Sequence, residues 1–520
     1  MVPALQTRTP LAIVLFSALF VFSFDRLRTL GAAVPCRFMT VNPPLGSAAL
    51  RSRDTMPHGD ALPQDESLSQ RNSLPAARPP EGEHQRAGFY LPVRWKFALA
   101  LLAGMCWTGF AIYVADAWVR DLSVAIGPVP AYLVIYGIAV VPGFMNAFLV
   151  VSLMLDRRPG ARLSDARYPG ISILVAAYNE EASIVSTIES IARQQYEGPF
   201  QVVVINDGSS DSTAEKLASL SYPWLEVLNL ERNVGKANAL NAGLALVRHH
   251  LTITVDGDSY LYKEALHNLV RRYMSDPENT RAVAGAVLVR NSRKNFVTAI
   301  QEWDYFHGIA AIKRLQSLYQ GTLVAQGAFS IYDTALLREL NGWPHTVGED
   351  IVLTWAILER GYRVGFAENA CLFTNAPDTW LQFIRQRQRW SRGLIEAFKA
   401  HWRLLFKPRM TTLFIWWNLL FPYMDLVYTF AFIPGLVLAL FGIYWLAGPM
   451  TLLVLPLAML VNYLMYSIQS KMFTEQGLTV RRNVPGFIFY ALFYSIVLQP
   501  ACVVGYLQEV VSRTKKWGTK

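Results

Sequence analysis

Two long apolar runs in the N-terminal third constrain this chain more than any other feature of its sequence. Phe97–Val119 and Val129–Leu155 are each long enough to cross the hydrocarbon core of a bilayer as a helix. Basic residues stand outside the pair, whereas the connection carries only Arg120, which Asp121 balances. Since positive flanks stay on the cytoplasmic side, the runs predict a transmembrane hairpin over 96–156 with both outer ends in the cytoplasm.

The composition fits a membrane protein with a soluble part. Hydrophobic residues make up 52% of the 520 positions and charged residues 17%, a balance that is unusual for a soluble enzyme. The net charge of +10 favours contact with the anionic lipid of a bilayer and argues against nucleic acid as a partner. The cysteines lack paired spacing and predict neither a disulfide framework nor a zinc site. They are Cys36, Cys106, Cys371 and Cys502.

Residues 1–95 combine a short apolar run with a polar linker. Leu11–Phe24 suits a signal-peptide core better than a full span. A cleaved signal would leave the following residues outside the cell, which conflicts with the hairpin. The run is therefore either a marginal N-terminal helix or translated sequence upstream of a later start at Met39 or Met56. Residues 43–86 lack hydrophobic periodicity and predict a disordered linker.

Residues 165–378 alternate short apolar strands with helices. This order predicts a mostly parallel, doubly wound α/β sheet inserted between the transmembrane helices. The strands are expected at Ile171–Ala176, Gln201–Ile205, Leu225–Leu230 and Leu251–Val255. The helices between them are expected at Glu181–Gln195, after a capping box at Ser212-Thr213-Ala214-Glu215, and at Ala237–Val247. Ligands of such sheets bind at the carboxyl ends of the strands.

Polar clusters follow three of these strands. Asp256 and Asp258 form a D-x-D, a pattern that also occurs in surface turns but at a strand end favours a divalent cation held with substrate phosphates. Asp207 lies in an Asn-Asp-Gly turn, and its carboxylate could accept the N–H of a base such as uracil. Tyr178 and Glu180 would line the same pocket from the neighbouring strand end.

Lys236 and a pair of acids extend this set. Lys236 stands at a predicted helix start, where its ammonium and the free backbone N–H groups favour phosphate, although a lone lysine is more often solvated. Glu349 and Asp350 follow Gly348 where a turn meets the predicted helix Ile351–Arg360. A solvated acid pair is equally compatible with that spacing, but a carboxylate there could serve as a general base for an acceptor hydroxyl.

A basic amphipathic segment over 379–410 predicts interfacial helices on the cytoplasmic leaflet. That interpretation leaves unexplained why Gln386, Arg389 and Trp390 gather at its N-terminal end. The tryptophan offers a flat apolar face of the kind on which sugars stack, and the arginine can fork onto phosphate oxygens. The patch is therefore a candidate site for a diphosphate and an acceptor.

The C-terminal region, 411–511, returns to the membrane. Thr411–Ile468 predicts two or three spans with breaks at Pro422 and Pro434, and Val484–Val511 predicts another that Pro500 interrupts. Basic residues flank the last segment on both sides and would place both of its ends in the cytoplasm. A segment that crosses the membrane once has its ends on opposite sides. Either the segment is re-entrant, or the preceding region holds three spans.

Together these motifs resemble membrane-embedded family 2 glycosyltransferases of the processive kind. That group includes synthases of poly-β-1,6-N-acetylglucosamine, hyaluronan, chitin and cellulose, and the overall layout is most similar to the first of these. The shared pattern is an Asp in a D-D-G or N-D-G turn, a D-x-D, an E-D base and Q-x-x-R-W, which this chain carries in order across about 165–405. The flanking spans match by layout only.

The resemblance implies a GT-A fold and an inverting, processive β-glycosyltransferase that polymerises a UDP-sugar, with N-acetylglucosamine as the expected sugar. It assigns uracil to Asp207, Mg²⁺ or Mn²⁺ to Asp258 with Asp256, and the base role to Asp350. Gln386, Arg389 and Trp390 would hold the diphosphate and the acceptor, and the loop that begins at Gln326 would contact the acceptor.

The resemblance also implies a multi-pass protein of the inner (plasma) membrane with a cytoplasmic catalytic domain, a growing polysaccharide as acceptor, and room for an accessory membrane or export subunit. Two alternatives stay open: a non-processive transferase that acts on a lipid acceptor, and a catalytically inactive scaffold. Two departures from the pattern stand out. Asn206 replaces the first Asp of D-D-G, and Gly348 replaces the Thr of T-E-D, which predicts a looser base loop.

Overall fold

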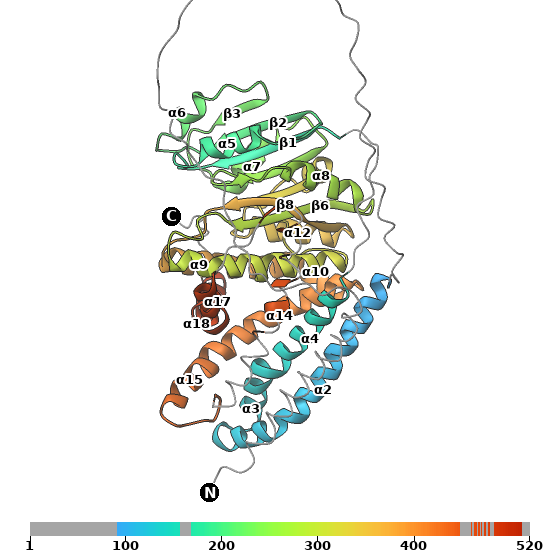
Figure 1. Cartoon of the computed structure of the whole chain (residues 1–520), viewed down its shortest axis with the longest axis vertical. Helices are drawn as coiled ribbons and strands as arrows, with labels where there is room; N and C mark the ends of the chain where they lie inside the picture. Colours follow the sequence, from blue (N-terminus) through green and yellow to red (C-terminus); the bar gives the residue numbers. More distant parts are fainter. Residues whose placement is uncertain are drawn as a thin grey trace, which may run out of the picture.

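The computed structural model describes residues 91–156, 168–447 and 483–511, together with scattered residues between 459 and 478. The expectations for residues 1–90 and for most of the basic flanks of the apolar runs lie outside these ranges. An α/β domain occupies one end of the molecule, a layer of helices lies across its base, and long apolar helices extend away on the far side (Figure 1).

The α/β domain is built on one sheet of eight strands in the order β3-β2-β1-β4-β7-β6-β8-β5. The first four strands of this order run parallel to one another, β7 is antiparallel to both neighbours, and β6 and β8 are parallel. A mostly parallel α/β sheet between apolar helices is thus confirmed. The strands are β1 (Ile171–Ala177), β2 (Phe200–Asn206), β3 (Leu225–Asn229), β4 (Leu251–Asp256), β5 (Tyr260–Leu261), β6 (Thr280–Val289), β7 (Phe329–Asp333) and β8 (Arg363–Thr374).

The helices that the sequence predicts in this domain lie close to their expected positions: α5 (Ile184–Ala192), α6 (Thr213–Ala218), α7 (Lys236–Leu244) and α12 (Glu349–Glu359). Two more, α8 (Ala265–Ser275) and α11 (Thr334–Glu339), were not predicted. The capping box expected at α6 is wrong, because the Ser212 side chain makes no cap hydrogen bond. Asp211 takes that role, since its carboxylate accepts the backbone N–H of Thr213 at 3.0 Å.

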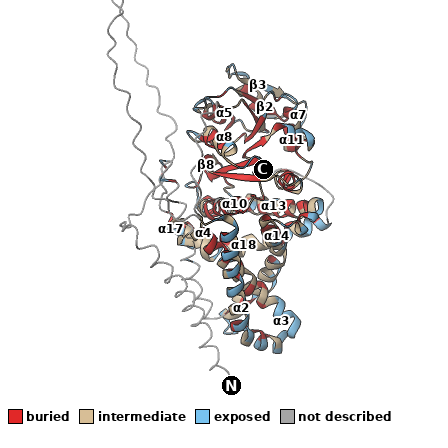
Figure 2. Ribbon diagram, turned by 90° about the vertical axis from the view of Figure 1, so that its right-hand side faces the viewer, coloured by how far each residue is buried: buried red, intermediate tan, exposed pale blue. Residues whose placement is uncertain are grey.

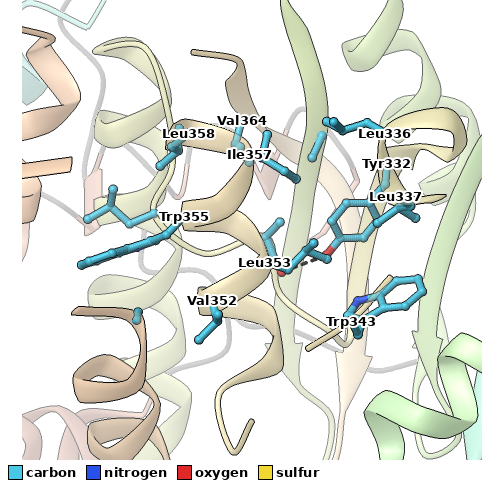
Figure 3. Close-up of a cluster of buried hydrophobic side chains, with 14 of the residues drawn as sticks. Tyr332, Leu336, Leu337, Trp343, Val352, Leu353, Trp355, Ile357, Leu358 and Val364 are labelled. Carbon is cyan, nitrogen blue, oxygen red and sulfur yellow. Dashed lines mark hydrogen bonds between the residues drawn. The ribbon is translucent and has the colours of Figure 1, made fainter. Parts of the chain in front are cut away.

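A layer of helices lies between the sheet and the apolar bundle. One continuous stretch comprises α9 (Phe296–Trp303), the π-helical η2 (Asp304–Ala311) and α10 (Ile312–Leu318). The amphipathic segment expected from residue 379 forms α13 (Trp380–His401) and the 3₁₀ turn η3 (Trp402–Phe406). Helix α12 is packed between this layer and the sheet: Leu353 lies beside Tyr332 of β7, whereas Trp355 points to the other side (Figure 3), where its ring is 4.8 Å from that of Phe398 on α13.

Among the residues that the structure describes, three helices are long and apolar enough to cross a membrane, and they span Val93–Ile126, Pro128–Met154 and Met410–Leu440. They are built from α2 (Val93–Ile126), α3 (Pro128–Ile135), η1 (Tyr136–Val140), α4 (Val141–Met154), α14 (Met410–Val427), η4 (Tyr428–Phe432) and α15 (Ile433–Leu440). Much of their surface is exposed in the isolated chain (Figure 2), as expected of helices that face lipid. The breaks expected at Pro422 and Pro434 are wrong, since α14 continues through the first and the span Met410–Leu440 includes the second.

The last described segment is a bent pair, α17 (Val484–Leu492) and α18 (Tyr494–Val511), with 53° between the two helices. The bend lies at Phe493, so the interruption expected at Pro500, which is inside α18, is wrong. Asn483 at the start of α17 donates to Glu302 on α9 at 2.7 Å. Glu509 near the end of α18 accepts from Lys399 on α13 at 3.0 Å. Both ends of the pair therefore contact the helical layer.

Candidate active site

The strand ends bring the predicted polar clusters to one edge of the sheet. Ala177 of β1 lies opposite Asn206 of β2, and Ala176 lies opposite Asp256 of β4. Because these three strands are adjacent and parallel, the residues that follow them share the carboxyl edge where ligands of such sheets bind. The backbone therefore places the three predicted polar clusters at one edge of the sheet, as the sequence predicts.

Asp256, Asp258 and Glu180 form an acidic group at this edge. Burial and the charges of Asp256 and Glu180 raise the pKa of the Asp258 carboxyl to about 6, against a hydrogen bond of 3.2 Å from the Thr374 hydroxyl. Such crowding of negative charge is what a divalent cation relieves. Among the described residues no group of three or more His, Cys, Asp or Glu side chains could hold a metal ion. Two carboxylates that leave positions for substrate phosphates and water nevertheless fit Mg²⁺ or Mn²⁺.

Lys236 opens α7 and lies between the acidic strand end and the base helix. Its Nζ pairs with Asp256 and is 3.9 Å from Oε1 of Glu349. Burial would lower the pKa of the lysine, but the carboxylates of Asp256 and Glu349 hold it above its ordinary value. The side chains of Lys236 and Glu349 are only 10% and 8% exposed, so little water screens the charge of the ammonium.

Glu349 had no assigned role on sequence grounds, yet it is one of the most buried acids near the site. Burial and the neighbouring Asp350 raise its pKa to about 7, against the favourable charges of Lys236 and Arg389. The buried ammonium of Lys236 interacts with the carboxylates of Asp256, Glu349 and Asp350. Glu349 is therefore a second partner that orients Lys236.

Asp207 is almost fully buried at the end of β2. Its two oxygens accept the backbone N–H groups of Val234 at 2.8 Å and Gly235 at 3.0 Å, which ties the strand end to the loop before Lys236. Each carboxylate oxygen keeps a second acceptor position, so contact with a base stays a prediction. Glu180 accepts the Ser183 hydroxyl at 2.8 Å, and the side chain of Tyr178 is exposed.

Asp350, the candidate base, stands in the first turn of α12. Its Oδ2 accepts the backbone N–H of Gly327 at 3.4 Å, and its Oδ1 accepts that of Ile351 at 2.8 Å. The loop before Gly327 is braced against the same helix, since Ala325 N–H donates to Thr354 Oγ1 at 2.8 Å. The predicted base and the predicted acceptor loop are thus in direct contact.

A buried lysine that the sequence did not single out supports this loop. Lys313 of α10 donates from Nζ to the carbonyl of Val324 at 3.0 Å. Burial lowers the pKa of Lys313 to about 7, although the charge of Asp350 opposes the shift. Lys313 therefore both holds the acceptor loop and places a titratable amine near the base.

Gly348 does not loosen the base loop, so that expectation is wrong. Its backbone N–H donates to Oε2 of Glu396 at 3.0 Å. A Cβ at this position would lie 2.5 Å from the Cα of Gly393 on α13, well inside normal contact. The missing side chain therefore lets the start of α12 touch α13 backbone to backbone, which joins the base to the helix of the acceptor patch.

The acceptor patch occupies successive turns of α13. Trp390 is 39% exposed, and Arg389 is close enough to Glu349 to lower its pKa. Two buried amide atoms, Oε1 of Gln386 and Nε2 of Gln326, have no hydrogen-bond partner among the described residues. Because buried polar groups are nearly always paired, these atoms mark places where a polar ligand would complete the site.

The geometry and the motifs agree with the comparisons with known proteins. Residues 169–393 match the family model described as "Glycosyltransferase like family 2". Residues 169–393 are therefore similar to family 2 glycosyltransferase domains and are built on a mostly parallel α/β sheet, which agrees with the class of enzyme predicted from the motifs.

The more specific resemblance is to poly-β-1,6-N-acetyl-D-glucosamine synthases. The protein of that name from Staphylococcus aureus (strain COL) is 28% identical over 288 residues, which cover 53% of this chain and 68% of the relative. The Staphylococcus epidermidis protein is 27% identical over 288 residues, with 55% and 68% covered. A solved mannosyltransferase, PcManGT from Pyrobaculum calidifontis in complex with GDP-Man and Mn²⁺, aligns with a TM-score of 0.47 at 17% identity, over 81% of this chain and 100% of its own.

Proposed function

We propose that the chain is an inverting, processive β-glycosyltransferase that polymerises N-acetylglucosamine from its UDP-sugar. The choice of sugar follows the named relatives. One observation carries the mechanism: Lys236 bridges Asp256 at the sheet edge and Glu349 beside the candidate base. A diphosphate between these groups would have its sugar close to Asp350.

The donor would bind along the sheet edge. Its uracil would lie near Tyr178 and Asp207, and its diphosphate would approach the ammonium of Lys236, which the acids now hold. A divalent cation at Asp256 and Asp258 would neutralise charge on the diphosphate of the leaving UDP. Arg389 would add fixed positive charge from α13.

The acceptor chemistry is assigned to Asp350. Its carboxylate takes the proton of the acceptor hydroxyl, and that oxygen attacks the anomeric carbon from the face opposite the diphosphate. The bond from that carbon to the diphosphate oxygen breaks as UDP leaves, so one displacement inverts the configuration. The contact between Gly327 N–H and Asp350 would keep the acceptor loop and the base in register during this step.

The product side is assigned to the membrane. Trp390 would stack on the terminal sugar, and the helices Val93–Ile126, Pro128–Met154 and Met410–Leu440 would embed the protein in the inner membrane with the catalytic domain in the cytoplasm. The ion pair of 2.5 Å between Asp156, after α4, and Arg314 of α10 supports this arrangement, because it docks the hairpin onto the helical layer.

The test is UDP release by the purified full chain with a panel of UDP-sugars, followed by digestion of the product with linkage-specific hydrolases. We expect UDP-N-acetylglucosamine to give the fastest release and a product that a β-1,6-specific hydrolase degrades. Release of UDP with only one sugar added per acceptor would overturn the processive assignment. A product resistant to that hydrolase would overturn the linkage.

A further inference from the structure

Arg387 lies inside the acceptor patch but belongs to none of its predicted roles. It is buried on α13 between Gln386 and Gln388. Its Nη2 donates to Oδ2 of Asp304 at 2.7 Å, with 4% and 12% of the two side chains exposed. A buried guanidinium must be paired to be tolerated, and this carboxylate holds the pKa of Arg387 above its ordinary value against burial.

The guanidinium also stacks on the indole ring of Trp390, the proposed platform for the acceptor sugar. Its Cζ is 4.0 Å from the ring centroid of Trp390 and 4.9 Å from that of Phe383. At that distance a planar cation attracts the indole face and restricts its rotation. Because Trp390 remains 39% exposed, part of its ring stays accessible to a ligand while the arginine supports it.

The support continues into the π-helical segment η2. Asp304 holds Arg387, and the adjacent Tyr305 places its ring 6.3 Å from that of Trp390. Two consecutive residues of η2 thus brace the platform at two points. π-Helical segments within longer helices often occur at functional sites, and η2 lies where the long helix α9–η2–α10 passes the patch.

Helix α18 closes the other side of the arginine. The charge of Arg387 interacts with Tyr494 and Cys502, both on α18. A Cβ at Gly505 would lie 2.0 Å from Oγ of Ser391 and 2.5 Å from the carbonyl oxygen of Gln388, so α18 touches α13 at the patch itself. The platform is therefore packed against a helix of the C-terminal apolar region.

We propose that Arg387 is a positioning residue that fixes Trp390 as the acceptor platform and links its orientation to η2 and α18. The inference rests on the proposed function, since a platform matters only if a sugar acceptor is held between additions. A fixed indole retains the growing chain after each transfer. A mobile indole would bind the acceptor less tightly, so the enzyme would release shorter products. The donor contacts at the sheet edge would stay intact.

The test compares two variants of the purified full chain with the wild type. Arg387→Lys keeps a charge for Asp304 but loses the planar stack, and the double variant Arg387→Gln/Asp304→Asn removes both charges so that neither is left unpaired. Arg385→Gln is the matched control, because Arg385 is exposed two residues earlier on the same helix. The measurements are donor KM by UDP release, acceptor KM with β-linked N-acetylglucosamine oligosaccharides, and product length on a sizing gel.

For both Arg387 variants we expect an acceptor KM about tenfold higher and shorter products, with donor KM and the control unchanged. Wild-type product length and acceptor KM in both variants would overturn the inference. So would an equal fall of all rates without shortening, which indicates a structural role alone. A wild-type protein that releases UDP but forms no polymer would instead overturn the proposed function, and the inference with it.

Discussion

The two halves of the proposed site, one assigned to the donor and the other to the acceptor, are built in different ways. The donor half consists of residues at the ends of adjacent parallel strands, which the register of one sheet places together. The acceptor half consists of the start of α12 and the turns of α13, which meet through Gly348 and Gly393. The first arrangement depends on backbone hydrogen bonds between strands, whereas the second depends on the close packing of two helices against each other. The donor half should therefore tolerate changes in packing that the acceptor half does not.

The largest effect is expected at the centre of the donor half. Asp258→Asn removes one of the two candidate cation ligands and should lower polymer formation at least about 10³-fold, since a metal contributes several kcal/mol to charge stabilisation. Chelation of divalent cations should do the same to the wild type, with recovery on addition of Mg²⁺ or Mn²⁺. Radiolabelled sugar incorporation measures both, and full activity in chelator would remove the cation from the mechanism.

The contact between Gly348 and Gly393 within the acceptor half should be nearly as sensitive. Gly348→Ala places a methyl 2.5 Å from the Cα of Gly393 and must displace the start of α12. A shift of about 1 Å at Asp350 should lower kcat about 10²-fold and leave donor KM unchanged. Gly109→Ala on α2 is the control, because a Cβ there meets nothing within 4 Å. Equal kcat in the two variants would show that the contact is unimportant.

A smaller effect, on stability, should follow the ionisation of Glu349. Its folded pKa of about 7 lies above the ordinary value of 4.5, so the stability contributed by its protonation is complete below 4.5 and is lost as pH rises through 7. Relative to Glu349→Gln, the wild type should lose a few degrees of Tm between about pH 6 and pH 8, at roughly 2–4 °C per kcal/mol. Thermal unfolding of both proteins over that range measures it. Parallel curves would mean that Glu349 does not titrate there.

The smallest effect is expected at the support of the acceptor loop. Lys313→Met removes the hydrogen bond to Val324 but keeps the length and apolar stem of a side chain that is buried. The loss of one such bond should lower kcat a few-fold, with donor KM unchanged. Initial rates of UDP release at saturating donor measure it. A change in donor KM alone would place Lys313 in the donor half instead.

The same contrast explains what the sequence could reveal. A short apolar strand followed by a polar cluster is a local sequence pattern. The sheet and the positions of Asp207, Asp256 and Asp258 at the carboxyl ends of its strands could therefore be predicted. Contacts between distant segments leave no such pattern: the pairing of Gly348 with Gly393 is an example, and Glu349 as a partner of Lys236 is another. The sequence did not predict the bend at Phe493, because Pro500, seven residues later, is the residue that usually breaks a helix. In the structure α18 continues through Pro500.

The most direct test of the division is donor binding by Asp350→Asn, compared with Asp258→Asn. Equilibrium binding of the UDP-sugar and incorporation of labelled sugar would be measured on the same purified proteins. We expect Asp350→Asn to bind donor with wild-type affinity and to form no polymer, whereas Asp258→Asn should fail in both. Polymer formation at the normal rate by Asp350→Asn, or loss of its donor binding, would refute the assignment of the base and the separation of the two halves.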